Sequence, residues 1–301
     1  MRRTLYSYRI VNVFAETPFS GKAVAVFADA SGLDTLSMAA VARELHFPQC
    51  VFVFPPGDGS DRPRVRVFTP TVELPRAGLP MIATVFAMHL DKQGGQHHGL
   101  AKPERIVLEQ AEEPVSVAFS APVFTVRHEV PLFGNVYPER ETAAALLSLR
   151  PDQLGASPVE VAWSGIPYLL IPLKGPQVLA AAKLRESIWE RTLRYSEAPN
   201  VLTFTLRDVA PGVLANLRVF TPAYGVLEES ASENAVGPLL GYILRHGLAD
   251  LPIEHAVVFQ QGAAVGRPSF LHAAYERSGS ELVSLRVGGQ CIVMGEGTIY
   301  V

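Results

Sequence analysis

A five-residue phrase, Arg-Val-Phe-Thr-Pro, occurs twice in this 301-residue chain, at positions 66–70 and again at positions 218–222. In each copy, alternating apolar residues predict a strand that ends at the Thr-Pro pair, because proline cannot donate to the ladder of a sheet. Each strand leads into a loop of acidic and small residues, and each loop leads into an apolar, helix-like run. Two copies this far apart do not make a solenoid of short repeats. They predict two similar halves, with a ligand site in the cleft between them.

The other expected elements favour sheets over helices. One helix-like run follows each copy of the phrase, at positions 81–90 and 235–244, and Asp34 is expected to cap a further helix. Positions 122–137 contain prolines and a glycine that interrupt regular structure, so we expect no regular element there. Strands account for most of the remaining pattern. We therefore predict an α+β fold, in which each half is a mixed β-sheet rolled around a central helix.

The two halves are expected to meet near the middle of the chain. The N-terminal half comprises residues 1–125 together with a returning strand at about 290–301, and the C-terminal half comprises residues 126–289. A chain of this length is expected to form two cores, because a single hydrophobic core stops growing at roughly 250–300 residues.

The composition excludes several classes of protein. The net charge is −3 and the pI is about 6.3, which provides no basic surface for nucleic acid. No apolar run approaches the roughly 18 residues of a membrane span, and positions 6–14 alternate like a strand instead of forming the apolar core of a signal peptide. The two cysteines are too few for a disulfide framework. We expect a cytoplasmic protein that binds neither nucleic acid nor membranes.

Further short motifs occur along the chain in a specific order. They lie at positions 13–14, 18–21, 42–44, 66–70, 73–75, 77–78, 80, 218–222, 261–262 and 266–269. In this order they resemble the phenazine-biosynthesis isomerase family (PhzF-like), which shares its fold with diaminopimelate epimerase and proline racemase. The resemblance implies two pseudo-symmetric halves with the active site in the groove between them. It also implies proton shifts on a small-molecule substrate without a metal or organic cofactor, and a homodimer.

The position of the family's acid–base residue is changed in this chain. In the family a glutamate follows a serine just after the first helix, and these two positions are Pro48 and Gln49 here. An amide has no proton to give and no useful basicity, so Gln49 can only form hydrogen bonds. Because neighbouring residues of a strand point to opposite faces, we expect Gln49 to line the cleft and Cys50 to lie in the core.

The first loop after the doubled phrase also departs from the family. The family's Ala-Gly-His-Pro is Ala-Gly-Leu-Pro here, so Leu79, directly after Gly78, replaces a polar histidine with an apolar wall. Three charged residues are further candidates for substrate binding. Glu73 matches the family, Arg76 is either a cation at the rim of the cleft or a solvated charge, and Lys22 either faces a substrate anion or lies on the surface.

The second loop, at positions 228–235, reads Glu-Glu-Ser-Ala-Ser-Glu-Asn-Ala where the family has Glu-Asp-Pro-Ala-Thr-Gly-Ser-Ala. Glu229 stands at the family's site aspartate and is either a base or a solvated loop acid. Ser232 stands at the family's threonine. Glu233 and Asn234 replace the Gly-Ser whose amides bind a substrate carboxylate in the family, and a glutamate there repels such an anion. Asn234 is also a favourable N-cap for the following helix, and Glu233 suits the helix dipole.

These substitutions lead to three hypotheses. The first is a divergent isomerase-type biosynthetic enzyme of secondary metabolism that acts without a cofactor on a small, less anionic or more apolar metabolite. In this hypothesis Glu229 is the base, and Gln49 and Ser232 orient the substrate. The second is a non-catalytic homologue that binds a small molecule or a partner protein. The third is a cyclase that acts by shape alone, for which a preorganised apolar cleft suffices.

Overall fold

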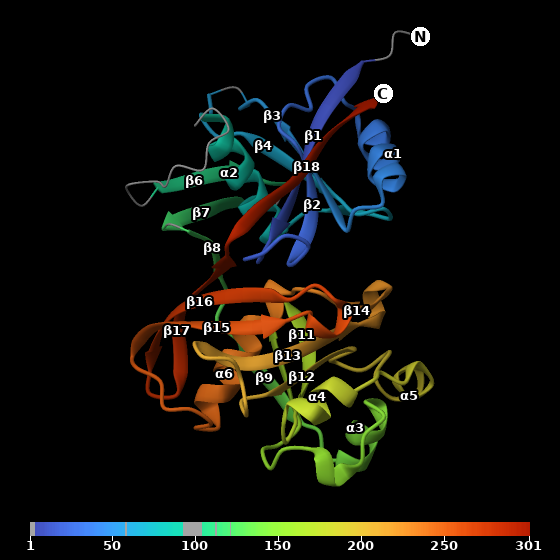
Figure 1. The fold of residues 1–301 in the computed structure, drawn as a ribbon, viewed down its shortest axis with the longest axis vertical. Helices are drawn as coiled ribbons and strands as arrows, with labels where there is room; N and C mark the ends of the chain where they lie inside the picture. Colours follow the sequence, from blue (N-terminus) through green and yellow to red (C-terminus); the bar gives the residue numbers. More distant parts are fainter. Residues whose placement is uncertain (1–3, 58, 93–103, 112, 121) are drawn as a thin grey trace. The chain divides into compact units, whose positions relative to one another are not determined.

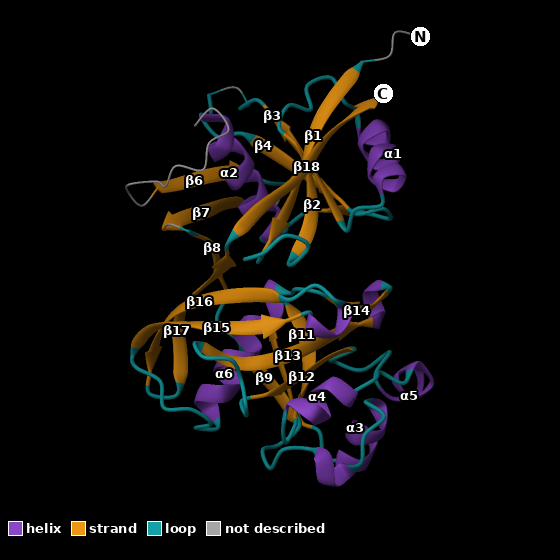
Figure 2. Cartoon of the chain, viewed as in Figure 1, coloured by secondary structure: helices purple, strands orange, loops and turns teal. Residues whose placement is uncertain are grey.

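The computed structural model describes residues 4–57, 59–92, 104–111, 113–120 and 122–301. The chain divides into two compact units (Figure 1). Unit 1 consists of Met1–Arg127 together with Gly288–Val301, and unit 2 consists of His128–Val287. Strands outnumber helices in each unit (Figure 2). Among the described residues, no helix is both long enough and apolar enough to cross a membrane.

Unit 1 is a mixed sheet with one helix on each face. Strands β2 and β3 are parallel, and so are β4 and β6, whereas the pairs β18–β1, β1–β2, β3–β4, β6–β7 and β7–β8 are antiparallel. Helix α2 packs against β1, β2, β3 and β7. The elements are β1 (Leu5–Val13), β2 (Lys22–Phe27), α1 (Thr35–Leu45), β3 (Gln49–Phe54), β4 (Arg64–Phe68), β5 (Glu73–Leu74), α2 (Leu79–Lys92), β6 (Glu104–Glu109), β7 (Pro114–Ser120), β8 (Val123–His128) and β18 (Cys291–Tyr300).

Helix α1 covers the other face of this sheet. It begins after Asp34, whose carboxylate accepts a hydrogen bond of 2.7 Å from the Ser37 amide, so the expected cap is confirmed. Met38 and Val41 of α1 pack against Cys50 and Phe52 of β3 in one buried cluster. Because alternate residues of a strand face opposite sides, β3 divides its side chains between α1 and α2.

Unit 2 repeats the order of unit 1. Strands β11 and β12 are parallel, as are β13 and β15, and the pairs β9–β10, β10–β11, β12–β13, β13–β14 and β15–β16 are antiparallel. The elements are β9 (Leu132–Val136), α3 (Arg140–Leu146), η1 (Pro151–Gln153), β10 (Glu160–Ser164), β11 (Ile166–Pro172), α4 (Pro176–Ala181), α5 (Glu186–Thr192), β12 (Asn200–Thr205), β13 (Val213–Thr221), η2 (Pro222–Tyr224), β14 (Val226–Glu229), η3 (Glu233–Ala235), α6 (Val236–Arg245), β15 (Glu254–Gln261), η4 (Ala263–Val265), β16 (Ser269–Ser278) and β17 (Glu281–Gly289).

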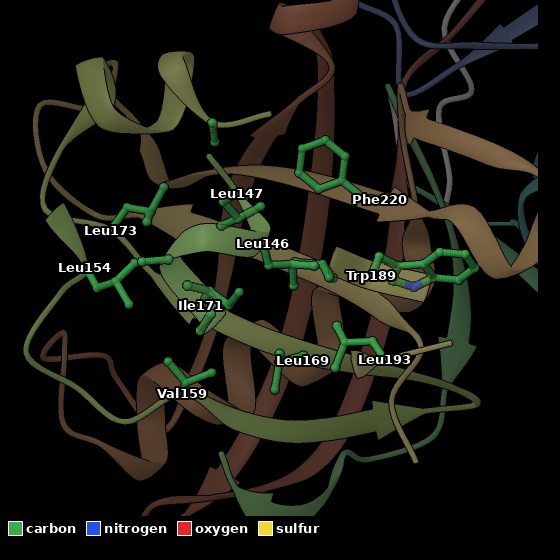
Figure 3. Close-up of a cluster of buried hydrophobic side chains, with 14 of the residues drawn as sticks. Leu146, Leu147, Leu154, Val159, Leu169, Ile171, Leu173, Trp189, Leu193 and Phe220 are labelled. Carbon is green, nitrogen blue, oxygen red and sulfur yellow. The ribbon is translucent and has the colours of Figure 1, made fainter. Parts of the chain in front are cut away.

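The two faces of the unit 2 sheet are covered by different helices. Helix α6 packs against β10, and the Tyr242 ring meets Phe204 of β12 edge-on at 5.4 Å. On the other face, α3, α4 and α5 contribute to a cluster of buried side chains around Leu169 and Ile171 of β11 (Figure 3). Trp189 and Phe220 belong to the same cluster. Unit 2 therefore has a core of its own on each side of the sheet.

The two copies of the doubled phrase occupy the same place in their units. Each forms a strand, β4 or β13, that is antiparallel to the strand before it and parallel to the strand after the following helix. Each arginine also binds a glutamate with two hydrogen bonds: 2.7 and 2.6 Å from Arg66 to Glu73, and 2.8 and 2.6 Å from Arg218 to Glu228. Each guanidinium lies over the phenylalanine two residues later, at 5.3 and 5.2 Å. The α+β class with two pseudo-symmetric halves is confirmed.

The expectation of no regular element at positions 122–137 is wrong. Two strands form there, β8 and β9. The alternation of Phe124 and Val126, both buried, fits β8 to the core. In β9, Gly134 lies so close to the Val161 and Trp163 side chains that a Cβ atom would come within 3.2 Å of both. The glycine interrupts no strand here, because it lets β9 lie close beside its antiparallel partner β10.

Candidate functional site

Glu229 is the last residue of β14 in unit 2. Its neighbour Glu228 points to the other face of the strand and is bound by Arg218, with both side chains 10% exposed. Glu229 itself is half-buried and lies on the side of Thr221, whose hydroxyl is 3.4 Å from its carboxylate. The strand therefore places the two neighbouring carboxylates on opposite faces.

Ser232 faces a buried tyrosine that the sequence did not suggest. Its hydroxyl lies 3.1 Å from that of Tyr168, which is on β11 and has no exposed surface. Burial raises the pKa of Tyr168; the hydrogen bond between Tyr168 and Ser232 opposes this rise, and the charges of Glu229 and Glu233 add to it. Tyr168 is therefore a neutral hydroxyl near two carboxylates, so it can donate a hydrogen bond but cannot act as a phenolate.

The loop between Glu229 and Ser232 is held by Gln261, which is 1% exposed. Its amide oxygen accepts a 3.1 Å hydrogen bond from the Ser232 amide, and its amide nitrogen donates one of 2.8 Å to the Glu229 carbonyl. The next residue, Gly262, has φ +79°, and a Cβ atom there would meet the Ser230 carbonyl oxygen at 2.4 Å. The motif at 261–262 contributed to the resemblance, but its role depends on contacts with residues far away in the sequence.

The remaining loop residues, Glu233 and Asn234, are half-buried. Both lie inside the short 3-10 helix η3, and α6 follows with Ala235 in its N-cap position and no side-chain cap. The expectation that Asn234 caps this helix is therefore wrong. The 3-10 turn moves the start of α6 past Asn234, so its side chain is not placed to accept from the first amides of α6.

In unit 1, Gln49 is the first residue of β3 and is half-buried. Its amide oxygen is enclosed and accepts no hydrogen bond. Cys50 has no exposed surface and belongs to the cluster under α1, and burial raises its thiol pKa to about 12. The expected opposition of the two side chains is therefore found within unit 1.

Gly78 and Leu79 form the start of helix α2. The Gly78 carbonyl accepts hydrogen bonds from the Met81 and Ile82 amides at 3.0 and 3.3 Å, and Leu79 is 1% exposed. The loop before them is held by Gln110, whose amide oxygen accepts a 3.2 Å hydrogen bond from the Ala77 amide. Gln110 is the counterpart of Gln261, because each glutamine directly follows the last residue of β6 or β15 that pairs with β4 or β13.

The charged candidates of unit 1 have other partners. Glu73 binds Arg66, and Arg76 makes an exposed ion pair of 2.9 Å with Glu113. Glu73 and Arg66 line a pocket of about 430 Å³ together with Phe54, and neither Gln49 nor Leu79 lines this pocket. Glu73 therefore lies on a different surface of unit 1 from Gln49.

Lys22 begins β2, opposite Val13, and is half-buried. It stands at the edge where β2 and β3 both start, since Val24 pairs with Gln49. In the described parts of the chain, no three His, Cys, Asp or Glu residues are grouped so as to hold a metal ion.

Comparison with known proteins identifies the family. The family described as "Phenazine biosynthesis-like protein" matches residues 11–297. A trans-2,3-dihydro-3-hydroxyanthranilate isomerase of Pseudomonas fluorescens is 29% identical, over 98% of this chain and 99% of the relative. A PhzF-family protein of Bacillus anthracis has the same fold with a TM-score of 0.87 at 20% identity, over 99% of this chain and all of that one. A hydroxyproline epimerase from Agrobacterium vitis shares the fold with a TM-score of 0.60 at 10% identity, over 100% of this chain and 92% of that one. The chain therefore belongs to the phenazine biosynthesis-like protein family, a family of isomerase type.

Proposed function

We propose that this protein is a biosynthetic isomerase that shifts a proton on a small metabolite, with Glu229 as the base. The reaction uses no metal or organic cofactor, and the metabolite belongs to secondary metabolism. The observation that carries the proposal is the position of Glu229. Its backbone is fixed by Gln261, and its carboxylate lies in the same group as Tyr168 and Ser232. A fixed carboxylate beside neutral hydroxyl groups is an arrangement that can remove and return a proton.

The relatives named as isomerases support the reaction type, and the substitutions in this chain argue for a different substrate. Gln49 holds no proton that it can transfer, and Leu79 presents no polar group. Glu233 adds a negative charge beside Tyr168. We infer a substrate that is less anionic or more apolar than the hydroxyanthranilate for which the Pseudomonas fluorescens relative is named. The resemblance also implies a homodimer, which light scattering in solution tests directly.

The experiment uses solvent deuterium as the reporter, because a proton shift exchanges the moved proton with water. Wild-type protein, Glu229→Gln and Glu276→Gln are incubated in D₂O with trans-2,3-dihydro-3-hydroxyanthranilate and, separately, with a metabolite extract. Glu276 is an exposed carboxylate on β16 of the same unit and serves as the matched control. We expect one metabolite to gain deuterium with wild type and the control, and to do so roughly 10²–10⁴-fold more slowly with Glu229→Gln. Equal incorporation by Glu229→Gln would remove it from the mechanism.

A non-catalytic binding protein is the second candidate, and Gln49 is the observation that favours it. A site that has lost its acid–base residue but kept its folded loops still binds small molecules. If no metabolite gains deuterium while the same extract raises the melting temperature of the protein, binding without turnover is the function.

A further inference from the structure

The arginines of the doubled phrase bind their glutamates in the same way but have different further partners. In each pair Nε and Nη2 of the arginine bind the carboxylate, which leaves Nη1 for another acceptor. Nη1 of Arg66 donates one hydrogen bond of 2.9 Å to the Thr35 hydroxyl. Nη1 of Arg218 instead lies at 2.9, 3.4 and 2.6 Å from three main-chain carbonyl oxygens, those of Leu179, Ala180 and Ala182.

This difference arises from the connection between two parallel strands. In unit 2, residues 173–199 join β11 to β12 and include α4 and α5, and α4 packs against β12 and β13. In unit 1, the shorter connection at residues 28–48 joins β2 to β3 and contains α1 alone. The end of α4 covers Arg218, whose side chain is 10% exposed, whereas the shorter connection leaves Arg66 34% exposed.

A pocket of about 430 Å³ lies beside Arg66 in unit 1. Its charged side chains are two arginines and two glutamates, namely Arg64, Arg66, Glu73 and Glu109. Much of the remaining wall is apolar and is formed by Leu33, Phe54, Val65, Leu74 and Pro75. The charges of the pocket balance, so the pocket favours a neutral ligand with apolar groups over an ion.

Arg66 can donate to such a ligand. Nη1 of an arginine carries two hydrogens, and the Thr35 hydroxyl takes one of them. No other acceptor contacts this nitrogen among the residues that the structure describes. An acceptor that entered the pocket would therefore take the place that the carbonyl groups of α4 hold beside Arg218.

We propose that this pocket binds a short apolar stretch of polypeptide, whose main-chain carbonyl groups accept hydrogen bonds from Arg66. The residues that do so beside Arg218, at positions 179–182, read Leu-Ala-Ala-Ala and carry only apolar side chains. A pocket of this volume has the size of a small-molecule site, so only a few residues of the partner enter it.

The stretch comes from a partner protein. Leu179 and Ala182 are buried in unit 2, where they belong to its core, so they are not available to the pocket of unit 1. The inference involves neither Glu229 nor the loop that carries it, and it does not depend on the proposed isomerase reaction.

A blocked pentapeptide with the sequence Val-Leu-Ala-Ala-Ala, which is that of residues 178–182, is the probe. NMR titration of the isotope-labelled full chain gives its dissociation constant. We expect a value in the millimolar range, with the largest shifts at the amides of Leu33, Phe54 and Leu74. A second peptide, with serine in place of valine and leucine, keeps the carbonyl groups and should bind about ten-fold more weakly, because it buries less apolar surface.

Two variants of the pocket are compared with matched controls. Arg66→Leu removes the donor and should weaken binding of the pentapeptide about ten-fold, whereas Arg150→Leu removes an exposed arginine of unit 2 and should bind as wild type does. Leu74→Trp fills the pocket and keeps every charge, so it should weaken binding about ten-fold or more even if Arg66→Leu does not fold. Its control is Leu36→Trp, because Leu36 is 80% exposed on α1 and lies outside the pocket.

The inference is wrong if the pentapeptide shifts no pocket residue, if the serine peptide binds equally well, or if Leu74→Trp binds the pentapeptide as tightly as wild type does. Light scattering tests the remaining occupant, a second copy of this chain. We expect Leu74→Trp to have the same mass in solution as wild type. A wild-type dimer that becomes a monomer in this variant would show that the pocket is filled by a second copy, and the proposal of a separate partner would fail.

Discussion

Tyr168 and Ser232 form a pair of hydroxyl groups beside the loop that follows β13. Each hydroxyl is the partner of the other at 3.1 Å, and both are buried. Because desolvation raises the pKa of Tyr168, the pair remains neutral over the range in which most proteins are stable. In the proposed reaction, this pair of neutral hydroxyl groups orients the substrate next to Glu229.

The strength of this pair can be measured by a double-mutant cycle. Ser232→Ala leaves the Tyr168 hydroxyl buried without its partner and should cost about 1–3 kcal/mol of unfolding free energy. In a Tyr168→Phe background the same change should cost much less, because no hydroxyl remains to be satisfied. Urea unfolding of the four proteins gives the coupling energy. A cost for Ser232→Ala that is the same in both backgrounds would show that the two hydroxyl groups do not interact.

Restoring the family's glutamate at position 49 should make the stability of the protein depend on pH. The amide oxygen of Gln49 is enclosed and accepts no hydrogen bond, so a carboxylate placed there is partly desolvated and its pKa rises. A raised pKa in the folded state penalises folding above that pKa, and the penalty disappears below the pKa of the unfolded chain. Gln49→Glu should therefore match wild type near pH 4 and be about 1 kcal/mol less stable near pH 8. Urea titrations at the two pH values measure this. A loss that is equal at both would contradict the desolvation argument.

At the scale of elements, the repeated strand–loop–helix unit is what the sequence predicted best. The doubled phrase could be recognised because its residues are contiguous, and the alternation of strand residues in β4 and β13 is strong. The edge strand β9 and the 3-10 turn before α6 could not be recognised. Their conformations depend on packing over Val161 and on where η3 ends, and neither leaves a local pattern.

The two arginine–glutamate pairs lie on the equivalent strands β4 and β13, but one pair is partly solvated and the other is nearly buried. The same substitution can therefore be compared in the two surroundings. Arg218 and Glu228 are each 10% exposed, and Arg218 also donates to the Leu179 and Ala182 carbonyls of the α4 region at 2.9 and 2.6 Å. The pair of Arg66 and Glu73 is 34% and 35% exposed. Lysine cannot reproduce the two-pronged contact of arginine.

Arg218→Lys should therefore cost about 1–3 kcal/mol of unfolding free energy, because it leaves buried acceptors without a donor. Arg66→Lys should cost about 0–1 kcal/mol, because its pair is partly solvated. Chemical denaturation of both variants in parallel measures the difference. Equal costs would mean that the carbonyl contacts of Arg218 contribute little.

At the scale of the whole molecule, the sequence predicted the fold class and the family but not the contacts that build the site. Gln261 and Gln110 hold the two loops through partners far away in the chain. In the sequence, these residues look like any other residues of a strand. Their contacts become visible only in the folded chain.

Unit 1 is built from two segments of the chain, so removing the second segment should destabilise it. Strand β18 pairs with β1 from Leu5–Tyr300 to Val13–Cys291, so a chain that ends at residue 287 leaves one edge of β1 without a partner along its whole length. We expect this chain to keep unit 2 folded and to lose protection of unit 1, because exposed strand edges and cores are cleaved readily. Limited proteolysis with mass spectrometry should give a resistant fragment that begins near residue 128. Protection of residues 4–127 equal to that in the longer chain would contradict this expectation.

The return of β18 to unit 1 has a consequence for the order of events during protein synthesis. Translation releases the chain from its N-terminus, and domains generally fold as units as they emerge. The residues of unit 2 precede β18 in the chain, so they leave the ribosome before β18 does. The unit that comes second in the sequence is therefore the first that can be completed, and residues 1–127 must wait, with the β1 edge open, until the final strand arrives. Chaperone binding during translation is expected to concentrate on this waiting segment.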